Sequence, residues 1–464
     1  MAQKKDAVII GSGQAGNPLA KRLAAAGWKC ALIERKWAGG TCINDGCTPT
    51  KTMIASARVA HLIQRSAEFG IHTTGFSVNI KEVLSRKNSV VDSFRGSIEK
   101  RLRQTPNLDY LFGEAFFSGE KEITVTKEDG SREAITAEKI FINAGTRPQI
   151  PAVPGLEGIP YLTSTSIMDL PEIPSQLLIL GGSYIALEFG QLYRRLGAEV
   201  TILEKAAHFL PKEDEDISDA VKKILEEEGI RILINTSIDR VASSGKSIQL
   251  DGSMGKEKFS VKGSHLLIAT GREPNTDRLQ PAAAGILLDK HGFIIVNDKL
   301  ETNIPGIYAL GDIKGGPQFT HISYNDHLVL YKNLVENGNE TIKDRLLNYC
   351  LFTDPELGRV GLTEKEARDQ GIPVKIATLP MTSVARGIET GETRGLLKAI
   401  VHADNKKIIG AATLAPGGGE LMSILQMAMM GGISYDKIRD MVFAHPTFAE
   451  SLNNLFIKLD KEKG

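Results

Sequence analysis

The 464-residue sequence has few cysteines, no excess of charge of either sign and no long apolar run. Four cysteines in a chain of this length exclude the disulfide framework of a small secreted protein. The formal net charge is +0, with 56 basic and 56 acidic residues, so nothing draws the chain electrostatically to nucleic acid or to an anionic membrane. The first apolar run, "AVII", has four residues, and no run approaches the ~20 residues of a membrane span. We therefore expect a cytoplasmic protein without nucleic-acid or membrane partners.

Two of the four cysteines, Cys42 and Cys47, lie close together in the segment "GGTCINDGCTPTK". A zinc site normally takes four ligands in tight pairs, and no other cysteine or histidine near these two completes such a set, so we expect no metal site. In a reducing compartment, a close cysteine pair is more often redox-active than structural. Cys30 and Cys350 have no such neighbours, and we expect both in the protein core.

The chain is long enough for two to four domains, and it contains the same unit twice. Residues 7–34 read "AVIIGSGQAGNPLAKRLAAAGWKCALIE", and residues 177–204 read "LLILGGSYIALEFGQLYRRLGAEVTILE". Each has an apolar strand, a glycine turn, a helical stretch and a second strand that ends in an acid. The acid follows the first glycine of the turn by 23 residues in both copies, as Glu34 and Glu204. This arrangement predicts two dinucleotide-binding β-α-β units.

The glycines of such a turn let the backbone approach a pyrophosphate at the N-terminus of the helix, where free N–H groups favour anions. The first copy has all three glycines, Gly11, Gly13 and Gly16. The second begins with Gly181 but has Ser183 and Ala186 at the other two positions. Ala is an accepted third residue, while Ser183 adds bulk where the pyrophosphate approaches. We still expect a nucleotide site in both copies.

Two further segments share one sequence pattern. "INAGTRPQIP" (142–151) and "IATGREPN" (268–275) each place a small-Gly-x-Arg turn after an apolar strand, with Gly145 and Gly271 in the turns. The stretch "RPQIPAVPGLEGIP" that follows the first turn is dense in proline and glycine, which is typical of a linker between domains. We therefore expect one nucleotide domain, residues 151–276, to be inserted into another that resumes after it.

With the pair Cys42 and Cys47, the two dinucleotide units and "IYALGDI" (307–313) in this order, the chain resembles the class I pyridine nucleotide-disulfide oxidoreductases. That family includes dihydrolipoamide dehydrogenase, glutathione reductase and mercuric reductase. "GSGQAGNPLA", "INDGCTPTKT" and "FTHISYND" are similar to a branch called mercuric-reductase-like, or compared with the bacterial reactive-chlorine resistance flavoprotein.

The resemblance implies an α/β fold with two nested Rossmann-like domains, for FAD and NAD(P), a C-terminal α+β dimerisation domain, and a homodimer. We expect the first part of the FAD domain in residues 1–150, the NAD(P) domain in 151–276, a central FAD-contacting segment in 277–345 and the dimerisation domain in 346–464.

The segment around the two cysteines favours redox chemistry. Gly46 permits a distorted turn that could bring the two Cα atoms within disulfide reach. Pro49 suits the first turn of a helix, and a cysteine at a helix N-terminus has a stabilised thiolate. The resemblance implies that Cys47 lies against the flavin as a thiolate, while Cys42 attacks the external oxidant.

The resemblance also assigns roles to three residues near the flavin. Lys51 would lie near the reactive nitrogen of the flavin, with Glu188 as its partner, because an unpaired buried lysine is costly. The alternative for this pair is a surface salt bridge unrelated to the flavin. Tyr184 would cover the nicotinamide pocket, and its alternative is an ordinary core tyrosine.

His445 and Glu450, in "HPTFAE", match the acid–base pair of the family. Glu450 would orient the imidazole, and His445 would take a proton from a dithiol and return it. In this family the histidine comes from the partner subunit, so we expect no active monomer. The alternative is structural, because Thr447 and Glu450 also fit a T-x-x-E capping box.

The cofactor contacts follow from the resemblance and from the β-α-β units. Glu34 would hold the adenosine ribose of FAD, and Asp312 would bond the ribityl chain. Glu204 would hold the ribose of the nicotinamide cofactor and repel a 2′-phosphate, which favours NADH over NADPH. The other expected contacts are Gly11, Gly13, Gly16, Thr41 and Gly145 to FAD, and Gly181, Tyr184 and Gly271 to NAD(P).

We therefore predict an enzyme that passes electrons from NAD(P)H through FAD to Cys42 and Cys47, and on to a disulfide of a small molecule or protein or to another thiol-reactive oxidant. The alternatives are a Cu(II) or Hg(II) reductase, a dihydrolipoamide dehydrogenase, a flavoprotein with a mainly binding or regulatory role, and a monooxygenase-like flavoprotein without thiol chemistry. No cysteine follows Cys350, which disfavours dedicated mercury reduction. Asp45, between the cysteines, could disfavour negative charge on the thiols, attract a cation or face solvent.

Overall fold

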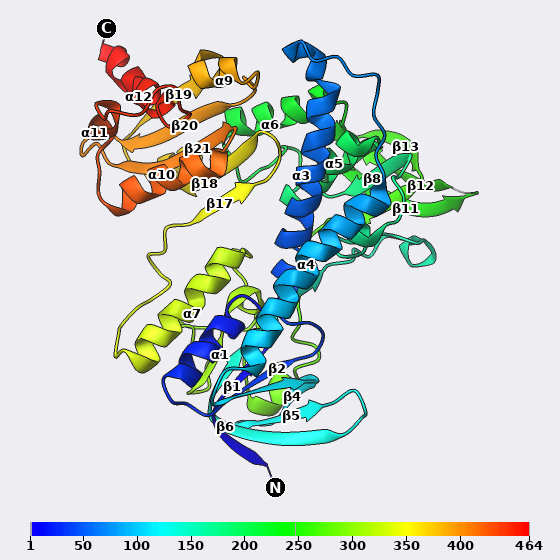
Figure 1. Ribbon diagram of the computed structural model, residues 1–464, viewed down its shortest axis with the longest axis vertical. Coiled ribbons are helices and arrows are strands. Elements are labelled where there is room, and N and C mark those ends of the chain that lie inside the picture. Colours follow the sequence, from blue (N-terminus) through cyan, green and yellow to red (C-terminus); the bar gives the residue numbers. More distant parts are fainter. Residues whose placement is uncertain (1, 246, 464) are drawn as a thin grey trace.

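The computed structural model describes residues 2–245 and 247–463, which form two dinucleotide-binding units and a C-terminal unit (Figure 1). The first unit is built on a seven-stranded sheet, whose neighbouring strands are β3 (Leu108–Phe112), β2 (Cys30–Glu34), β1 (Gln3–Ile10), β6 (Arg132–Ile142), β5 (Glu122–Thr126) and β4 (Glu114–Gly119), with β16 (Ile307–Ala309) also paired to β6. The strands β1, β2, β3, β6 and β16 pair in parallel, and β4 and β5 add an antiparallel edge. All of β2 is buried, as expected for a parallel strand covered on both faces.

Helix α1 (Gly16–Ala25) connects β1 to β2 and packs against α7 (Thr320–Val335). The two helices share one hydrophobic cluster, with Leu19 and Leu23 of α1 beside Val329 and Leu330 of α7. This packing brings a helix from late in the sequence to the first dinucleotide turn. As a result, the N-terminus of α7 lies at the same cleft as the cysteine segment.

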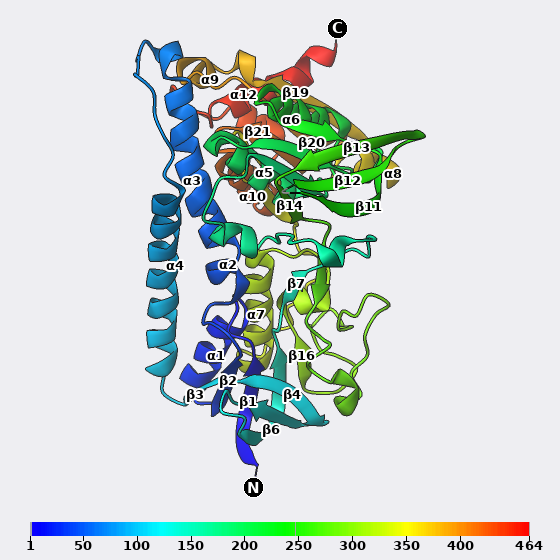
Figure 2. The ribbon, with the colours of Figure 1, turned by 90° about the vertical axis from the view of Figure 1, so that its right-hand side faces the viewer.

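The second unit repeats the plan around a parallel sheet of β10 (Arg231–Leu233), β9 (Glu199–Leu203), β8 (Gln176–Leu180) and β14 (His265–Ile268). Helix α5 (Tyr184–Leu196) follows β8, and α6 (Glu215–Glu227) follows β9. The antiparallel strands β11 (Thr236–Ser244), β12 (Ser247–Met254) and β13 (Glu257–Gly263) form a separate three-stranded sheet (Figure 2). Both predicted β-α-β units are confirmed.

The two segments that share the small-Gly-x-Arg pattern pair with each other. β7 (Thr146–Pro148) and β15 (Arg272–Pro274) form an antiparallel two-stranded ribbon. The Arg272 guanidinium donates to the hydroxyl and the carbonyl oxygen of Thr146, both at 2.8 Å. The chain thus enters and leaves the second unit side by side.

The C-terminal unit is an antiparallel sheet of β17 (Asn348–Leu351), β18 (Glu356–Gly361), β21 (Ile408–Ala415), β20 (Leu396–His402) and β19 (Val374–Pro380). Helix α10 (Gly418–Met430) packs on β18 and β21, and the short helices α8 (Glu364–Asp369), α9 (Ala385–Glu389), α11 (Tyr435–Arg439) and α12 (Ser451–Ile457) complete it. The predicted fold class, two nested Rossmann-like units with a C-terminal α+β unit, is confirmed; the predicted boundary positions stay predictions.

Helix α2 (Gly40–Asn44) and helix α3 (Cys47–Gln64) carry the cysteine segment. α3 runs beside the long helix α4 (Ile80–Arg103) along one side of the molecule (Figure 2) and packs on α5 of the second unit. Met53 and Ala57 of α3 share a cluster with Leu187 and Phe189 of α5. This packing places Lys51 of α3 opposite Glu188 of α5. Within the described residues, no helix is long and apolar enough to cross a membrane.

Candidate active site

Most of the predicted site residues line one cleft, which has a volume of 370 Å³. Its walls include the first glycine turn, the cysteine segment, the start of α5 and the turn after β16. The predicted residues that line it are Gly11, Gly13, Glu34, Thr41, Cys42, Cys47, Lys51, Gly145, Tyr184, Glu188 and Asp312. Positions 445 and 450 are not part of this lining, nor are Gly16, Gly181, Glu204 and Gly271.

The two cysteines lie on consecutive helices, with Cys42 inside α2 and Cys47 as the first residue of α3. Both are free thiols. Gly46 is required between them, because a Cβ there would lie 2.9 Å from the Thr41 carbonyl oxygen. The Cys47 Sγ lies 3.2 Å from the hydroxyl of Thr320, the first residue of α7.

The surroundings make the two thiols unequal. The hydrogen bond from Cys42 lowers the pKa of Cys47, and the Thr320 hydroxyl and the Lys51 charge act in the same direction, against burial and Glu188. The same bond to Cys47, together with burial, raises the pKa of Cys42. The first proton therefore leaves the pair with the charge on Cys47, and the two thiols titrate as one coupled system. A thiolate at this position is the reactive form of a cysteine.

Lys51 and Glu188 form an ion pair with an Nζ to Oε2 distance of 2.7 Å. Glu188 is only 4% exposed, so the pair is not a surface salt bridge. Its second carboxylate oxygen accepts the backbone N–H of Phe352 at 3.0 Å, and the Lys51 ammonium lies 4.6 Å from the centre of the Phe352 ring. The contacts hold a positive charge at the wall of the cleft, beside Cys47.

The glycine positions fit a bound dinucleotide. Gly11 has a φ of +100°, and a Cβ there would lie 2.3 Å from the Asn143 carbonyl oxygen. A Cβ at Gly40 would lie 2.6 Å from the Cα of Gly13, so the cysteine segment and the first glycine turn touch backbone to backbone. Together they form a cradle at the N-terminus of α1, where the first N–H groups of the helix have no intrahelical acceptor. The residues present therefore fit the pyrophosphate of FAD.

The two acids that end the β-α-β units have the same hydrogen bonds. Glu34 accepts the backbone N–H groups of Ser12 and Lys36, both at 2.9 Å. Glu204 accepts those of Gly182 at 2.5 Å and Ala206 at 2.7 Å. The acid in each copy is thus held beside the glycine turn, where the ribose of a dinucleotide lies.

The first glycine of the second copy matches that of the first. A Cβ at Gly181 would lie 2.3 Å from the Ala269 carbonyl oxygen, and its φ is +101°. Gly16 is needed for close approach of α1, because its Cβ would lie 2.1 Å from the Gly11 carbonyl oxygen. Gly145 and Gly271 also have positive φ values, +66° and +141°. Both turns therefore have the backbone conformation that favours glycine.

Asp312 and Tyr184 lie at the inner wall of the cleft. The Asp312 carboxylate accepts the Thr146 hydroxyl at 3.2 Å, and burial raises its pKa. Its remaining acceptor positions suit the hydroxyl groups of a ribityl chain. Tyr184 is half-buried, packs partly on the core and has the Phe319 ring at 5.8 Å, so it faces both the core and the cleft.

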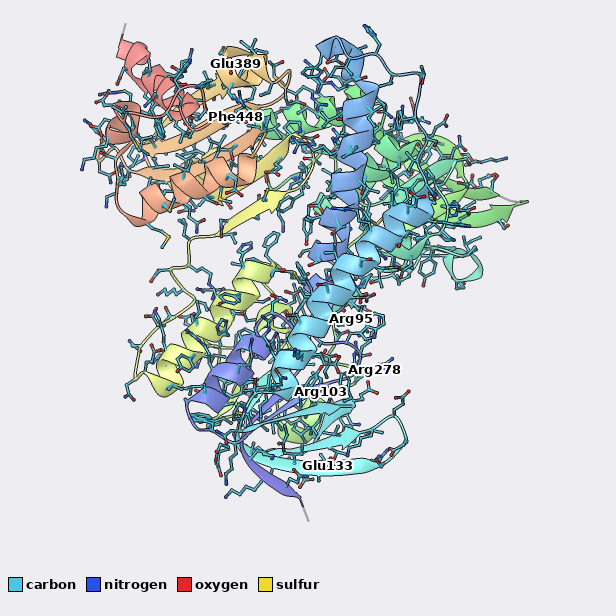
Figure 3. All side chains as sticks on the ribbon, in the orientation of Figure 1. Arg95, Arg103, Glu133, Arg278, Glu389 and Phe448 are labelled. Carbon is cyan, nitrogen blue, oxygen red and sulfur yellow. The ribbon has the colours of Figure 1, made fainter. Side chains whose placement is uncertain are left out.

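His445 and Glu450 pair with each other in the C-terminal unit and do not line this cleft. Phe448, which lies between them in the sequence, is labelled in Figure 3. The Nδ1 to Oε2 distance is 2.9 Å, and the His445 side chain is 67% exposed. The Thr447 hydroxyl accepts the Glu450 N–H at 3.2 Å, which is half of a capping box. The Glu450 carboxylate bonds His445, so capping alone does not account for its position.

Asp45, between the two cysteines, forms an ion pair with a lysine. Its carboxylate lies 3.6 Å from the Lys36 Nζ. Lys36 and Arg95 both lie over the ring of Trp37, at 4.1 and 4.4 Å, and Arg95 of α4 (Figure 3) donates to the Asn44 side chain at 2.6 Å. The turn between the cysteines is therefore anchored to the nucleotide end of the cleft.

Of the other two cysteines, Cys30 is buried in the core as expected, and burial raises its pKa to about 12. Cys350 is only half-buried, although burial also raises its pKa. The sequence reasoning missed Thr320. Its segment, "FTHISYND", was used only to place the chain in a branch of the family. The contact with Cys47 joins residues 273 positions apart, which no local pattern reports.

Comparison with known proteins gives a consistent result. Residues 5–326 match the family model for pyridine nucleotide-disulphide oxidoreductases, and residues 347–456 match the dimerisation domain of that family. Over 457 residues the chain is 39% identical to the probable pyridine nucleotide-disulfide oxidoreductase RclA of Escherichia coli, with 98% of this chain and 99% of that protein covered.

Two further relatives are each 32% identical. They are a mercuric reductase of Lysinibacillus sphaericus, with 98% of this chain and 83% of the relative covered, and a dihydrolipoyl dehydrogenase of Chlamydia muridarum, with 97% and 96% covered. The solved Cu(II) complex of the HOCl-induced flavoprotein disulfide reductase RclA from Escherichia coli aligns with a TM-score of 0.91 at 38% identity, over 98% of this chain and 100% of that one. The predicted resemblance, including the branch, is confirmed.

Proposed function

The chain belongs to the pyridine nucleotide-disulphide oxidoreductase family, and from this premise we propose that Cys42 and Cys47 are its redox-active pair. Like the family, it is a flavoprotein oxidoreductase that uses FAD and a pyridine nucleotide. FAD, when bound, supplies two-electron transfer between the nicotinamide and the cysteine pair. The observation that carries the proposal is that both thiols, Lys51 and the first glycine turn line one cleft.

The unequal thiols divide the chemistry between them. In the reduced enzyme, Cys47 holds the negative charge, and Cys42 loses its proton and attacks one sulfur of a disulfide substrate. A mixed disulfide forms and one substrate thiolate leaves. The Cys47 thiolate then attacks the Cys42 sulfur, which closes the Cys42–Cys47 disulfide and releases the second thiolate. Two electrons have passed from the enzyme dithiol to the substrate.

His445 carries out the proton transfers. Glu450 bonds Nδ1, which leaves Nε2 free to take the proton of Cys42 and return it to the leaving thiolate. Because the pair lies away from the cleft of its own chain, we propose a homodimer in which His445 of the partner subunit faces the thiols. Its support is the dimerisation domain and the exposed apolar side chains of the same unit, including Met427 at 65%, Met430 at 74% and Val442 at 93% exposure.

We propose NADH as the preferred reductant. The Glu204 carboxylate is fixed by two backbone N–H groups at the position of the ribose, where it would repel a 2′-phosphate. The exposed residues Lys205 and His208 follow it closely and are the groups that could accommodate NADPH.

For the oxidant, we propose a disulfide or another thiol-reactive compound, because His445 and Glu450 suit a proton-coupled acceptor. Cu(II) is the second candidate, since the solved relative is described as a Cu(II) complex. Among the described residues, no cluster of three His, Cys, Asp or Glu side chains could hold a resident metal. As an electron acceptor, Cu(II) would be a substrate of the two thiols.

The test is anaerobic reduction with NADH or NADPH, followed by alkylation and mass spectrometry. We expect Cys42 and Cys47 to become alkylatable with one equivalent of NADH and to be reoxidised by the true acceptor. Lipoamide, glutathione disulfide and Cu(II) would be offered in turn, with the Cys42→Ser variant as control. Oxidant turnover that persists in Cys42→Ser would contradict the proposed role.

A further inference from the structure

The Thr320 hydroxyl contacts a reacting sulfur directly. Its Oγ1 lies 3.2 Å from the Cys47 Sγ, within the range of a hydrogen bond to sulfur. Thr320 begins α7, a helix of 16 residues, and Cys47 begins α3, a helix of 18 residues. Two helix N-termini, far apart in the sequence, therefore converge on one sulfur atom.

We propose that Thr320 is a further catalytic residue, whose hydroxyl donates a hydrogen bond to the Cys47 thiolate and so keeps the charge of the reduced pair on Cys47; this rests on the redox role proposed above. A thiolate can only accept, so the hydroxyl must be the donor whenever Cys47 is charged. Hydrogen bonds to charged groups are stronger than those between neutral groups, so the bond favours the thiolate over the thiol.

The bond also discriminates between the two sulfurs. A proton shared between two neighbouring thiols stays on the one whose anion is less well stabilised. The Thr320 hydroxyl lowers the pKa of both thiols, but its direct contact, at 3.2 Å, is with the Cys47 Sγ, so it favours the charge on Cys47. Without it, the charge would divide more evenly, and Cys42 would react with oxidants without the acid–base pair.

The segment that carries Thr320 is anchored through the neighbouring residue, Phe319. The Phe319 ring stacks on Tyr349 at 5.5 Å with an interplanar angle of 7°, and on His321 at 5.5 Å with an angle of 13°. The Tyr349 hydroxyl donates to the buried Glu213 of the second unit. An anchored ring on one side of Thr320 and the stiff χ1 of a β-branched side chain together hold the hydroxyl toward the sulfur.

The experiment measures the pKa of Cys47 in the reduced, FAD-loaded enzyme, from the pH dependence of its iodoacetamide alkylation by mass spectrometry. We expect Thr320→Val to raise that pKa by about one unit and to slow alkylation of Cys47 near pH 6.5 several-fold, while Thr320→Ser stays close to the wild type. Thr52→Val is the matched control, because the Thr52 hydroxyl donates to the Thr48 carbonyl oxygen at 2.8 Å within α3.

The outcomes separate this inference from the proposed function. An unchanged, low Cys47 pKa in Thr320→Val would overturn the role of Thr320 and leave the redox pair intact. An ordinary thiol pKa for Cys47 in the wild type would instead contradict the thiolate assignment itself. If Thr320→Val does not retain FAD, Thr320→Ala gives the same comparison without the added methyl group.

Discussion

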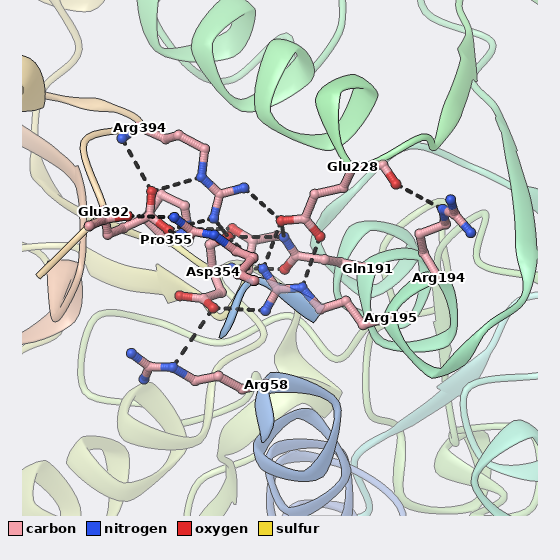
Figure 4. A network of polar contacts seen from close by, with 12 residues as sticks. Arg58, Gln191, Arg194, Arg195, Glu228, Asp354, Pro355, Glu392 and Arg394 are labelled. Atoms are coloured by element: carbon pink, nitrogen blue, oxygen red, sulfur yellow. Dashed lines mark hydrogen bonds and ion pairs between the residues drawn. The ribbon is translucent and has the colours of Figure 1, made fainter. Parts of the chain in front are cut away.

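Replacing Arg195 with methionine tests the junction between the second dinucleotide unit and the C-terminal unit. The Arg195 side chain is 3% exposed and lies at the centre of the ion network in Figure 4. Two of its nitrogens donate to the Glu228 carboxylate at 2.8 and 2.7 Å, and a third donates to Asp354 at 2.7 Å. Arg394 of the C-terminal unit also donates to Glu228, at 2.7 Å. The network therefore joins the two units through buried charges.

The expected loss of stability follows from the charges that stay behind. Removing one member of a buried ion pair costs about 3–5 kcal/mol, because its partner remains buried and unpaired. Here Glu228 keeps Arg394, and Asp354 keeps Arg58 at 3.8 Å. We therefore expect a loss near the lower end, about 3 kcal/mol, in the first unfolding transition. Methionine keeps most of the apolar volume, so a cavity adds little.

Urea unfolding of the FAD-loaded protein, followed by flavin release and tryptophan fluorescence, measures the effect. Arg194→Met is the matched control, because Arg194 lies on the same helix and donates to the carbonyl oxygens of Glu228 and Ala198, at 2.8 and 3.3 Å. We expect it to lose only about 1 kcal/mol. Equal losses in the two variants, or no loss in Arg195→Met, would refute the assignment of the network to the junction.

Three other predictions concern pH and cofactors. Burial lowers the pKa of His327 to about 4, so the unfolded chain takes up a proton from pH 6.5 downward while the folded protein resists it. Urea midpoints should show stability falling by about 3 kcal/mol between pH 6.5 and 4, less so in His327→Phe; an equal pH dependence in both proteins would count against this group. Glu204→Gln should lower the ratio of the KM for NADPH to the KM for NADH about tenfold, or about 1.4 kcal/mol, because the amide does not repel a 2′-phosphate. An unchanged ratio in steady-state kinetics with both cofactors would show that the acid does not select between them. Gly40→Ala should weaken FAD retention about tenfold on dialysis, because its Cβ would strike Gly13. Gly27→Ala, with a φ of +91° and open space around its Cβ, should retain FAD.

Local patterns predicted much of the fold and of the cofactor site. The spacing from the glycine turn to Glu34 and Glu204 identified both β-α-β units, because that spacing follows from one strand, one helix and one further strand. The helix that begins at Cys47 was expected from Pro49 and from the residue pattern that follows. The pairing of His445 with Glu450 was expected from the resemblance to the family, and the structure shows the contact.

Contacts between distant segments could not be predicted in the same way. Thr320 reaches Cys47 only because α7 packs on α1, and no local pattern reports that packing. Asp45 had three open interpretations, and its pairing with Lys36 depends on how the cysteine segment folds back over the nucleotide end of the cleft. The network around Arg195 likewise joins residues more than 150 positions apart.

The most direct test of the redox role of Cys42 and Cys47 is an anaerobic titration of the oxidised, FAD-loaded enzyme with NADH, with absorbance and thiol alkylation recorded together. With one equivalent, we expect both cysteines to become alkylatable and a long-wavelength absorbance to appear from the Cys47 thiolate beside the flavin. The absorbance should be absent in Cys47→Ser. If the flavin simply bleaches while Cys42 and Cys47 remain unreactive, the two thiols are not its redox partners and the proposed function is wrong.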